Sequence, residues 1–142
     1  MSDSNTSPFA RLRIIYLFLV LGSIASCAVL YFLRQMPAES NSSMPLLIAG
    51  ATICFPALFL LFVWSKRKAA SDAALMTNHL IAYSTAEGAA LANMMAYYIG
   101  GDTIHVVFAG LMVGAMIVRY PKPTASDGVD LRSGGSFKSG QE

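Results

Sequence analysis

The chain has 142 residues, of which 55% are hydrophobic and only 13% are charged. Soluble domains usually carry about 25% charged residues, because water must solvate their surfaces. The net charge of +2 is too small to indicate a nucleic-acid partner. This composition favours an integral membrane protein, for which the lipid bilayer is both solvent and partner.

The first half of the chain predicts two membrane-spanning helices. Residues 1–13 form a polar N-terminal segment that ends in basic residues. Residues 14–33 carry no charge and are long enough, at 1.5 Å per residue, to cross a hydrocarbon core of about 30 Å. Residues 34–44 read as a loop rich in Pro, Ser and Asn, and residues 45–65 as the second span.

The second half predicts two more spans. A basic loop, 66–71, precedes a third span over 72–99, which is less apolar than the first two. Residues 100–102 form a turn, 103–118 a short fourth span, and the Ser/Gly-rich tail 119–142 reads as disordered. The predicted fold is an all-α integral membrane protein, a four-transmembrane-helix bundle.

The distribution of basic residues predicts the orientation of this bundle. Apart from Arg34, every Lys and Arg lies in the N-terminal segment, the 66–71 loop or the C-terminal tail. Basic residues concentrate on the cytoplasmic side of membrane proteins, so both termini are expected in the cytoplasm. We expect a multi-pass protein of a bacterial-type inner membrane, with a cytoplasmic basic patch that attracts anionic lipid headgroups.

The first span has a second interpretation. Its residues Ile24-Ala25-Ser26-Cys27 resemble the lipobox of bacterial lipoprotein signals, in which cleavage leaves the cysteine as a lipidated N-terminus. The apolar run continues as far as Leu33. This continuation favours an uncleaved span.

The third span carries the most informative polar residues. Glu87 is near its middle, where an intramembrane acid is by default a functional hypothesis. His79, Tyr83 and Glu87 follow at i, i+4 and i+8 on one helix face, and Asn93 extends that side. His105 of the fourth span could meet this stripe across the hairpin. The spacing suits either a proton relay or a buried polar network that holds helices together.

Small residues mark the expected packing surfaces. Gly88 and Ala92 are four residues apart on the third span, and Gly110 and Gly114 form a GxxxG pair on the fourth. Small side chains let helix backbones approach closely in lipid. This packing could lie within one chain or between chains.

Other chemistry is less well supported. His79, Glu87 and His105 are too scattered for a metal site, whose ligands must converge at about 2 Å. We expect neither a metal nor a cofactor. No nucleophile–base pair is evident, so an enzyme is the least favoured class.

The segment Ala86-Glu87-Gly88-Ala89-Ala90 resembles the proton-carrying helix of rotary ATPase proteolipid (c-type) subunits. Those subunits place a carboxylate mid-membrane on the helix that follows a basic cytoplasmic loop, as Lys66-Arg67-Lys68 precedes the third span here. The resemblance covers only spans two and three. It implies that Glu87 is a reversible proton carrier.

Two functions remain open. The first is an accessory or oligomerising component that acts through helix packing, with a second copy or a membrane complex as partner. The alternative is proton or ion translocation through the mid-membrane carboxylate Glu87.

Overall fold

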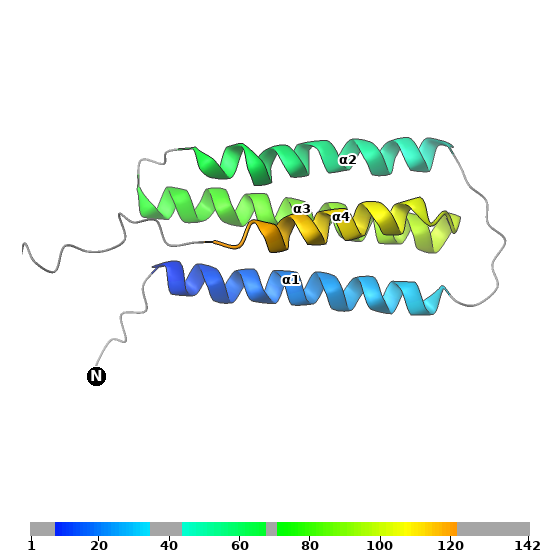
Figure 1. Ribbon diagram of the computed structural model, residues 1–142, viewed down its shortest axis with the longest axis horizontal. Coiled ribbons are helices and arrows are strands. Elements are labelled where there is room, and N and C mark those ends of the chain that lie inside the picture. The colour runs from blue at the N-terminus through cyan, green and yellow to red at the C-terminus, as the bar shows by residue number, and fades with distance from the viewer. Residues whose placement is uncertain (1–7, 35–43, 68–70, 122–142) are drawn as a thin grey trace, which may run out of the picture.

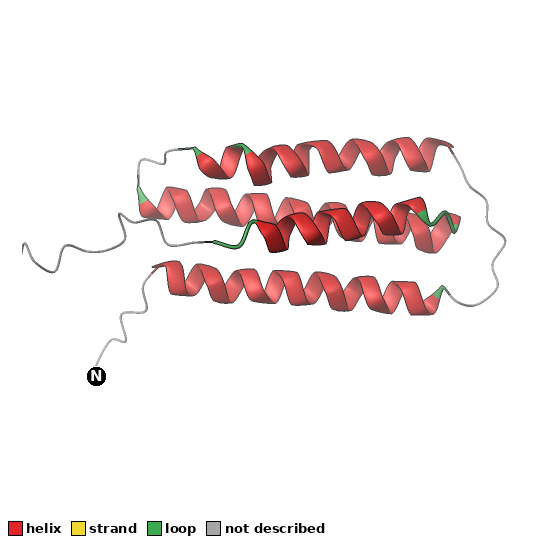
Figure 2. Ribbon diagram, viewed as in Figure 1, coloured by secondary structure: helices red, strands yellow, loops and turns green. Residues whose placement is uncertain are grey.

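The computed structural model describes residues 8–34, 44–67 and 71–121. Most of the predicted tail, most of the predicted 34–44 loop and half of the predicted 66–71 loop lie outside these residues. Residues 119–121 of the tail lie within them, and the start of the tail is not disordered as predicted, because the Arg119 backbone N–H donates to the carbonyls of Ala115 and Met116 in a turn. The described part is 90% helical and contains no strand, as Figures 1 and 2 show. The expected all-helical class is confirmed for this part of the chain.

The helices run alternately in opposite directions along one axis (Figure 1). They are α1 (Pro8–Leu33), α2 (Met44–Phe62), α3 (Asp72–Gly100) and α4 (Ile104–Val118), with a 3-10 turn, Trp64–Lys66, after α2. The start of α1 and the end of α4 lie at the same end of the bundle, here called the terminal end. The opposite end carries the turn between α3 and α4 and is called the turn end.

Helix α3 packs against all three other helices. Helix α4 packs on α3 and α2 and only weakly on α1, while α1 and α2 do not contact each other within the described residues. Figure 1 accordingly shows α1 and α2 on opposite sides of the α3–α4 pair. The polar third helix therefore occupies the centre of the bundle.

Small residues fill the interfaces and large apolar residues cover the outside. The fully buried positions include six alanines: Ala57, Ala82, Ala86, Ala89, Ala90 and Ala109. By contrast, Phe18 and Phe55 are 73% and 74% exposed. A water-soluble bundle would place such aromatic side chains in its core. A surface this apolar is compatible with a membrane environment.

Among the described residues, two helices are long and apolar enough to cross a membrane: Arg11–Leu33 and Met44–Lys66. Only 17% and 22% of their most apolar windows are buried inside the molecule. These low fractions distinguish both from the core helix of a soluble protein, which would be mostly buried. They give the chain a surface compatible with membrane association.

The helix boundaries differ from the predicted spans in ways the local sequence explains. Helix α1 begins at Pro8, before the apolar run, because Pro suits a first helical position and Leu12 is buried within the bundle. Helix α3 ends at Gly100, and Gly101 adopts a left-handed conformation (φ 79°) that glycine tolerates. An added Cβ at Gly101 would collide with the Arg34 side chain.

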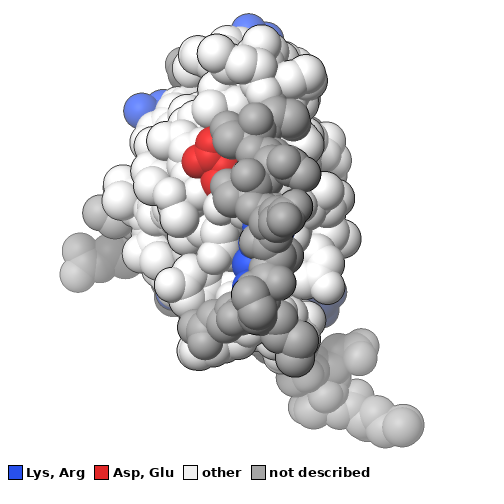
Figure 3. Space-filling model, turned by 90° about the vertical axis from the view of Figure 1, so that its right-hand side faces the viewer, with Lys and Arg blue, Asp and Glu red and all other residues white. Residues whose placement is uncertain are grey.

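The turn end of the bundle carries little charge. Figure 3 looks onto this end and shows a largely uncharged surface with a small acidic area and few basic atoms. The Arg34 guanidinium donates a hydrogen bond to the Tyr98 carbonyl and lies 5.6 Å from the Tyr97 ring centroid. Arg34 thereby joins the end of α1 to the end of α3.

Candidate functional site

The best-defined polar cluster lies between α2, α3 and α4 and centres on Asn93. The Asn93 amide nitrogen donates to the carbonyls of Ala89 (2.9 Å) and Gly50 (3.3 Å). Its amide oxygen lies 3.1 Å from Nδ1 of His105. Asn93 is fully buried and His105 is 2% exposed. One side chain thus links three helices through hydrogen bonds.

This geometry determines the protonation of the imidazole. Two backbone carbonyls face one end of the Asn93 amide, so that end must be the NH₂ group. The other end is then the oxygen, which only accepts hydrogen bonds. Nδ1 of His105 must therefore carry a proton and donate it to Asn93. In this arrangement Asn93 and His105 form a hydrogen-bonded clamp between α3 and α4.

Gly50 makes this clamp possible. A Cβ built at Gly50 would lie 2.5 Å from Oδ1 of Asn93 and 2.8 Å from Nδ1 of His105. Real Cβ atoms do not approach polar atoms so closely. Gly50 is the single glycine in the second span, but the sequence alone does not show which residues it faces.

A second cluster, of tyrosines and arginine, lies at the terminal end. The Tyr83 hydroxyl donates to the Arg119 carbonyl, and the Tyr16 hydroxyl donates to the Met116 carbonyl at 3.0 Å. The two tyrosine rings pack edge to face at 5.1 Å, and His79 stacks on Tyr83 at 6.0 Å. These contacts satisfy carbonyls at the C-terminal end of α4, which an isolated helix would leave unpaired.

Arg119 extends this cluster to α2. Its Nε donates to the Leu61 carbonyl at 3.1 Å, and a terminal nitrogen donates to the Ser65 hydroxyl at 2.9 Å. The sequence predicts Arg119 only as the first residue of the tail, 119–142, directly after the fourth span. Its role as a bridge between helix ends depends on the spatial proximity of α2 and α4, which no local pattern reveals.

Glu87 lies apart from both clusters, on the side of α3 that faces α1. Its carboxyl is half-buried, has the Ser23 hydroxyl as a hydrogen-bonding partner, and would lie 3.8 Å from a Cβ at Gly22. Ser23 donates its single proton to the Leu19 carbonyl at 2.8 Å. Ser23 and Glu87 thus form a small polar contact between α1 and α3.

The side chains of the predicted polar stripe thus lie in three separate places in the structure. Asn93 and His105 lie together, His79 and Tyr83 lie together, and Glu87 lies on another side of α3. Within residues 8–34, 44–67 and 71–121, no hydrogen bond joins Glu87 to Tyr83 or Asn93. The same ranges contain no group of three or more His, Cys, Asp or Glu residues that could hold a metal ion.

The predicted packing glycines face outward. Gly88, Ala92 and Gly110 are exposed, Gly114 is partly exposed, and a Cβ at any of the three glycines would meet nothing within 4 Å. Packing inside the chain instead uses the buried alanines of α3, which are Ala82, Ala86, Ala89 and Ala90. At the three glycines there is therefore open space for a Cβ atom.

No protein-family model, curated protein or solved structure matches the chain.

Proposed function

We propose that the chain is a four-span protein of a bacterial-type inner membrane, with both termini in the cytoplasm. In this proposal it is an accessory or oligomerising component that acts through helix packing, and its self-association surface is the outward face of α3. The observation that carries the proposal is this face, on which Ser84, Gly88 and Ala92 are exposed and a Cβ at Gly88 would meet nothing within 4 Å.

The membrane part of the proposal is supported by the distribution of residues. Polar side chains such as Asn93, His105 and Ser23 are buried, while large apolar side chains cover the outside of the bundle. Hydrocarbon solvates apolar surface but leaves polar groups unpaired, so this arrangement suits lipid better than water.

The self-association surface consists of Ser84, Gly88 and Ala92, which repeat every four residues and are all exposed. The Ser84 hydroxyl has no hydrogen-bond partner among the described residues. An unpaired hydroxyl is unfavourable in hydrocarbon. A covering helix would remove it from lipid, and the absence of side-chain bulk at Gly88 would let that helix approach closely.

A second copy of the chain is the occupant that this face fits best. All copies insert with the same orientation, so two α3 helices related by a two-fold axis along the membrane normal run parallel. The same three residues then meet their equivalents, and Ser84 of one copy lies near Ser84 of the other. Polar and small residues together are what membrane helices use to associate.

The substitution Gly88→Leu tests the proposal. A Cβ at Gly88 meets nothing within 4 Å, so the monomer accepts the larger side chain. In mild detergent we expect Gly88→Leu to weaken self-association by about tenfold, which is ~1.4 kcal/mol. Native mass spectrometry and fluorescence energy transfer between labelled copies measure this change.

The matched control is Ala49→Leu, at an exposed alanine on α2. It adds similar bulk to a different face and is expected to leave the oligomer unchanged. An oligomer distribution that is the same for wild type and Gly88→Leu would refute the proposed surface.

The alternative function, proton or ion translocation, has one specific observation in its favour. The half-buried Glu87 carboxyl borders the proposed surface and hydrogen-bonds only with Ser23 among the described residues. A carboxyl in that position can exchange a proton with a group brought by a partner. The division of the polar stripe into separate places disfavours a continuous relay inside one chain.

A further inference from the structure

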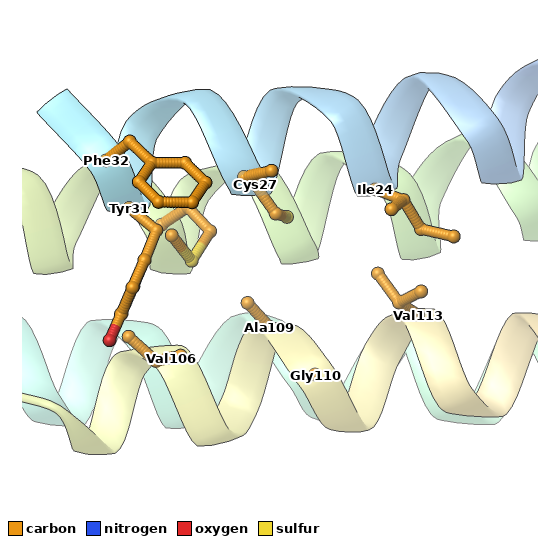
Figure 4. A pocket seen from close by; sticks show the side chains of 10 residues that line it. Ile24, Cys27, Tyr31, Phe32, Val106, Ala109, Gly110 and Val113 are labelled. Atoms are coloured by element: carbon orange, nitrogen blue, oxygen red, sulfur yellow. The ribbon is translucent and has the colours of Figure 1, made fainter.

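An apolar groove separates α1 from α4 in the half of the bundle near the turn end. It has a volume of about 310 Å³ and almost no polar lining. Figure 4 shows its two walls: Ile24 of α1 faces Val113 of α4 at one end, and Tyr31 lies beside Val106 at the other. The groove therefore runs along the helix axes.

The groove exists because small residues line both walls. Ala28 of α1 and Gly110 of α4 leave space that larger side chains would fill, and a Cβ at Gly110 would meet nothing within 4 Å. Helix α1 packs mainly on α3, so its contact with α4 is slight. Ala28 and Gly110 are both exposed, so the groove opens on the outside of the bundle.

The shape and lining suit an extended hydrocarbon chain. The distance along α1 from Ile24 to Tyr31 is about 10 Å at 1.5 Å per residue. An apolar cavity of about 150 Å³ is enough to bind benzene. A groove of about 310 Å³ that is elongated along the helices therefore has room for a run of methylene groups.

The end of the groove near the turn has a cation beside it. The Tyr31 ring stacks on Tyr97 at 5.9 Å, and the Arg34 guanidinium lies 5.6 Å from the centroid of the same Tyr97 ring. Arg34 donates one N–H to the Tyr98 carbonyl. A guanidinium has five N–H donors, so others remain for a phosphate.

We propose that this groove binds one acyl chain of a phospholipid whose phosphate lies at Arg34. The proposal rests on the four-span membrane bundle proposed above, in which Arg34 faces the outer leaflet. The apolar walls select the chain and the guanidinium selects the anionic headgroup. An outer-leaflet lipid then fills the space between α1 and α4 and stabilises their weak contact.

The test uses native mass spectrometry of the full chain purified in mild detergent with phosphatidylglycerol added at increasing concentration. Wild type is expected to retain one lipid per chain after excess lipid is removed. Ala28→Phe and Gly110→Leu fill the groove from opposite walls and are each expected to lower the affinity by about tenfold. Arg34→Gln is expected to abolish the preference for phosphatidylglycerol over a neutral diacylglycerol.

The control is Ala49→Phe, at an exposed alanine outside the groove. Equal retention by wild type and both groove variants would mean annular lipid only and overturn the proposal, as would an equal loss in Ala49→Phe. The same spectra test the lipid groove and the self-association surface of α3 independently of each other. Loss of lipid in Ala28→Phe with an intact oligomer supports the groove alone, and an unchanged oligomer in Gly88→Leu contradicts the self-association surface alone.

Discussion

Gly50 and Gly88 are both glycines inside helices, yet their surroundings are opposite. Gly50 is buried against the Asn93–His105 clamp, while Gly88 is exposed with open space around it. Glycine lowers helix stability by roughly 0.5–1 kcal/mol relative to alanine. The sequence identified Asn93 and His105 as candidates for one polar network, but it could not show that Gly50 provides the space for their contact.

The paired substitutions Gly50→Ala and Gly88→Ala test this difference. Gly50→Ala places a methyl group 2.5 Å from Oδ1 of Asn93, and such overpacking typically costs about 1–3 kcal/mol. Gly88→Ala is expected to stabilise the monomer by roughly 0.5–1 kcal/mol through helix propensity. Denaturant unfolding in a detergent that keeps the chain monomeric measures both changes, and a Gly50→Ala variant as stable as Gly88→Ala would contradict the clamp.

At the scale of elements, the apolar runs predicted four helices, but the faces of α3 were harder to predict. The i, i+4, i+8 spacing predicts His79, Tyr83 and Glu87 on one side, and in the structure His79 stacks on Tyr83. Glu87 turns toward α1 and Asn93 toward α2 and α4. A stripe about 80° wide on a central helix borders more than one neighbour, so periodicity alone cannot assign a partner to each residue.

The substitution Glu87→Gln distinguishes the accessory role through helix packing from proton translocation. An amide has N–H donors and nearly the shape of a neutral acid, so the contact with Ser23 is retained and the oligomer is expected to persist. In liposomes with an imposed pH gradient, we expect wild type to show no proton flux above that of empty vesicles. Flux through wild type that Glu87→Gln abolishes, with assembly intact, would contradict the accessory role and establish translocation.

For the whole molecule, composition and the apolar runs predicted the helical class, while the orientation expected from the basic residues stays a prediction. The all-helical class followed from the apolar runs, and the alternating helix directions agree with both described ends lying at one end of the bundle. Helix α4 is too short to cross a hydrocarbon core by itself. Its 15 residues span about 22 Å, and the core is about 30 Å thick. Its C-terminal end is held by Tyr16, Tyr83 and Arg119 through contacts between distant parts of the sequence.

Cysteine accessibility in intact spheroplasts of a bacterial host tests the central claim of a four-span bundle most directly. In a background with Cys27→Ala and Cys54→Ala, Thr103→Cys and Ala73→Cys place single thiols at exposed positions near opposite ends of α3. A membrane-impermeant thiol reagent is expected to label Thr103→Cys in intact spheroplasts and Ala73→Cys only after lysis. Equal labelling of both thiols before lysis, or the reverse order, would contradict the proposed membrane topology.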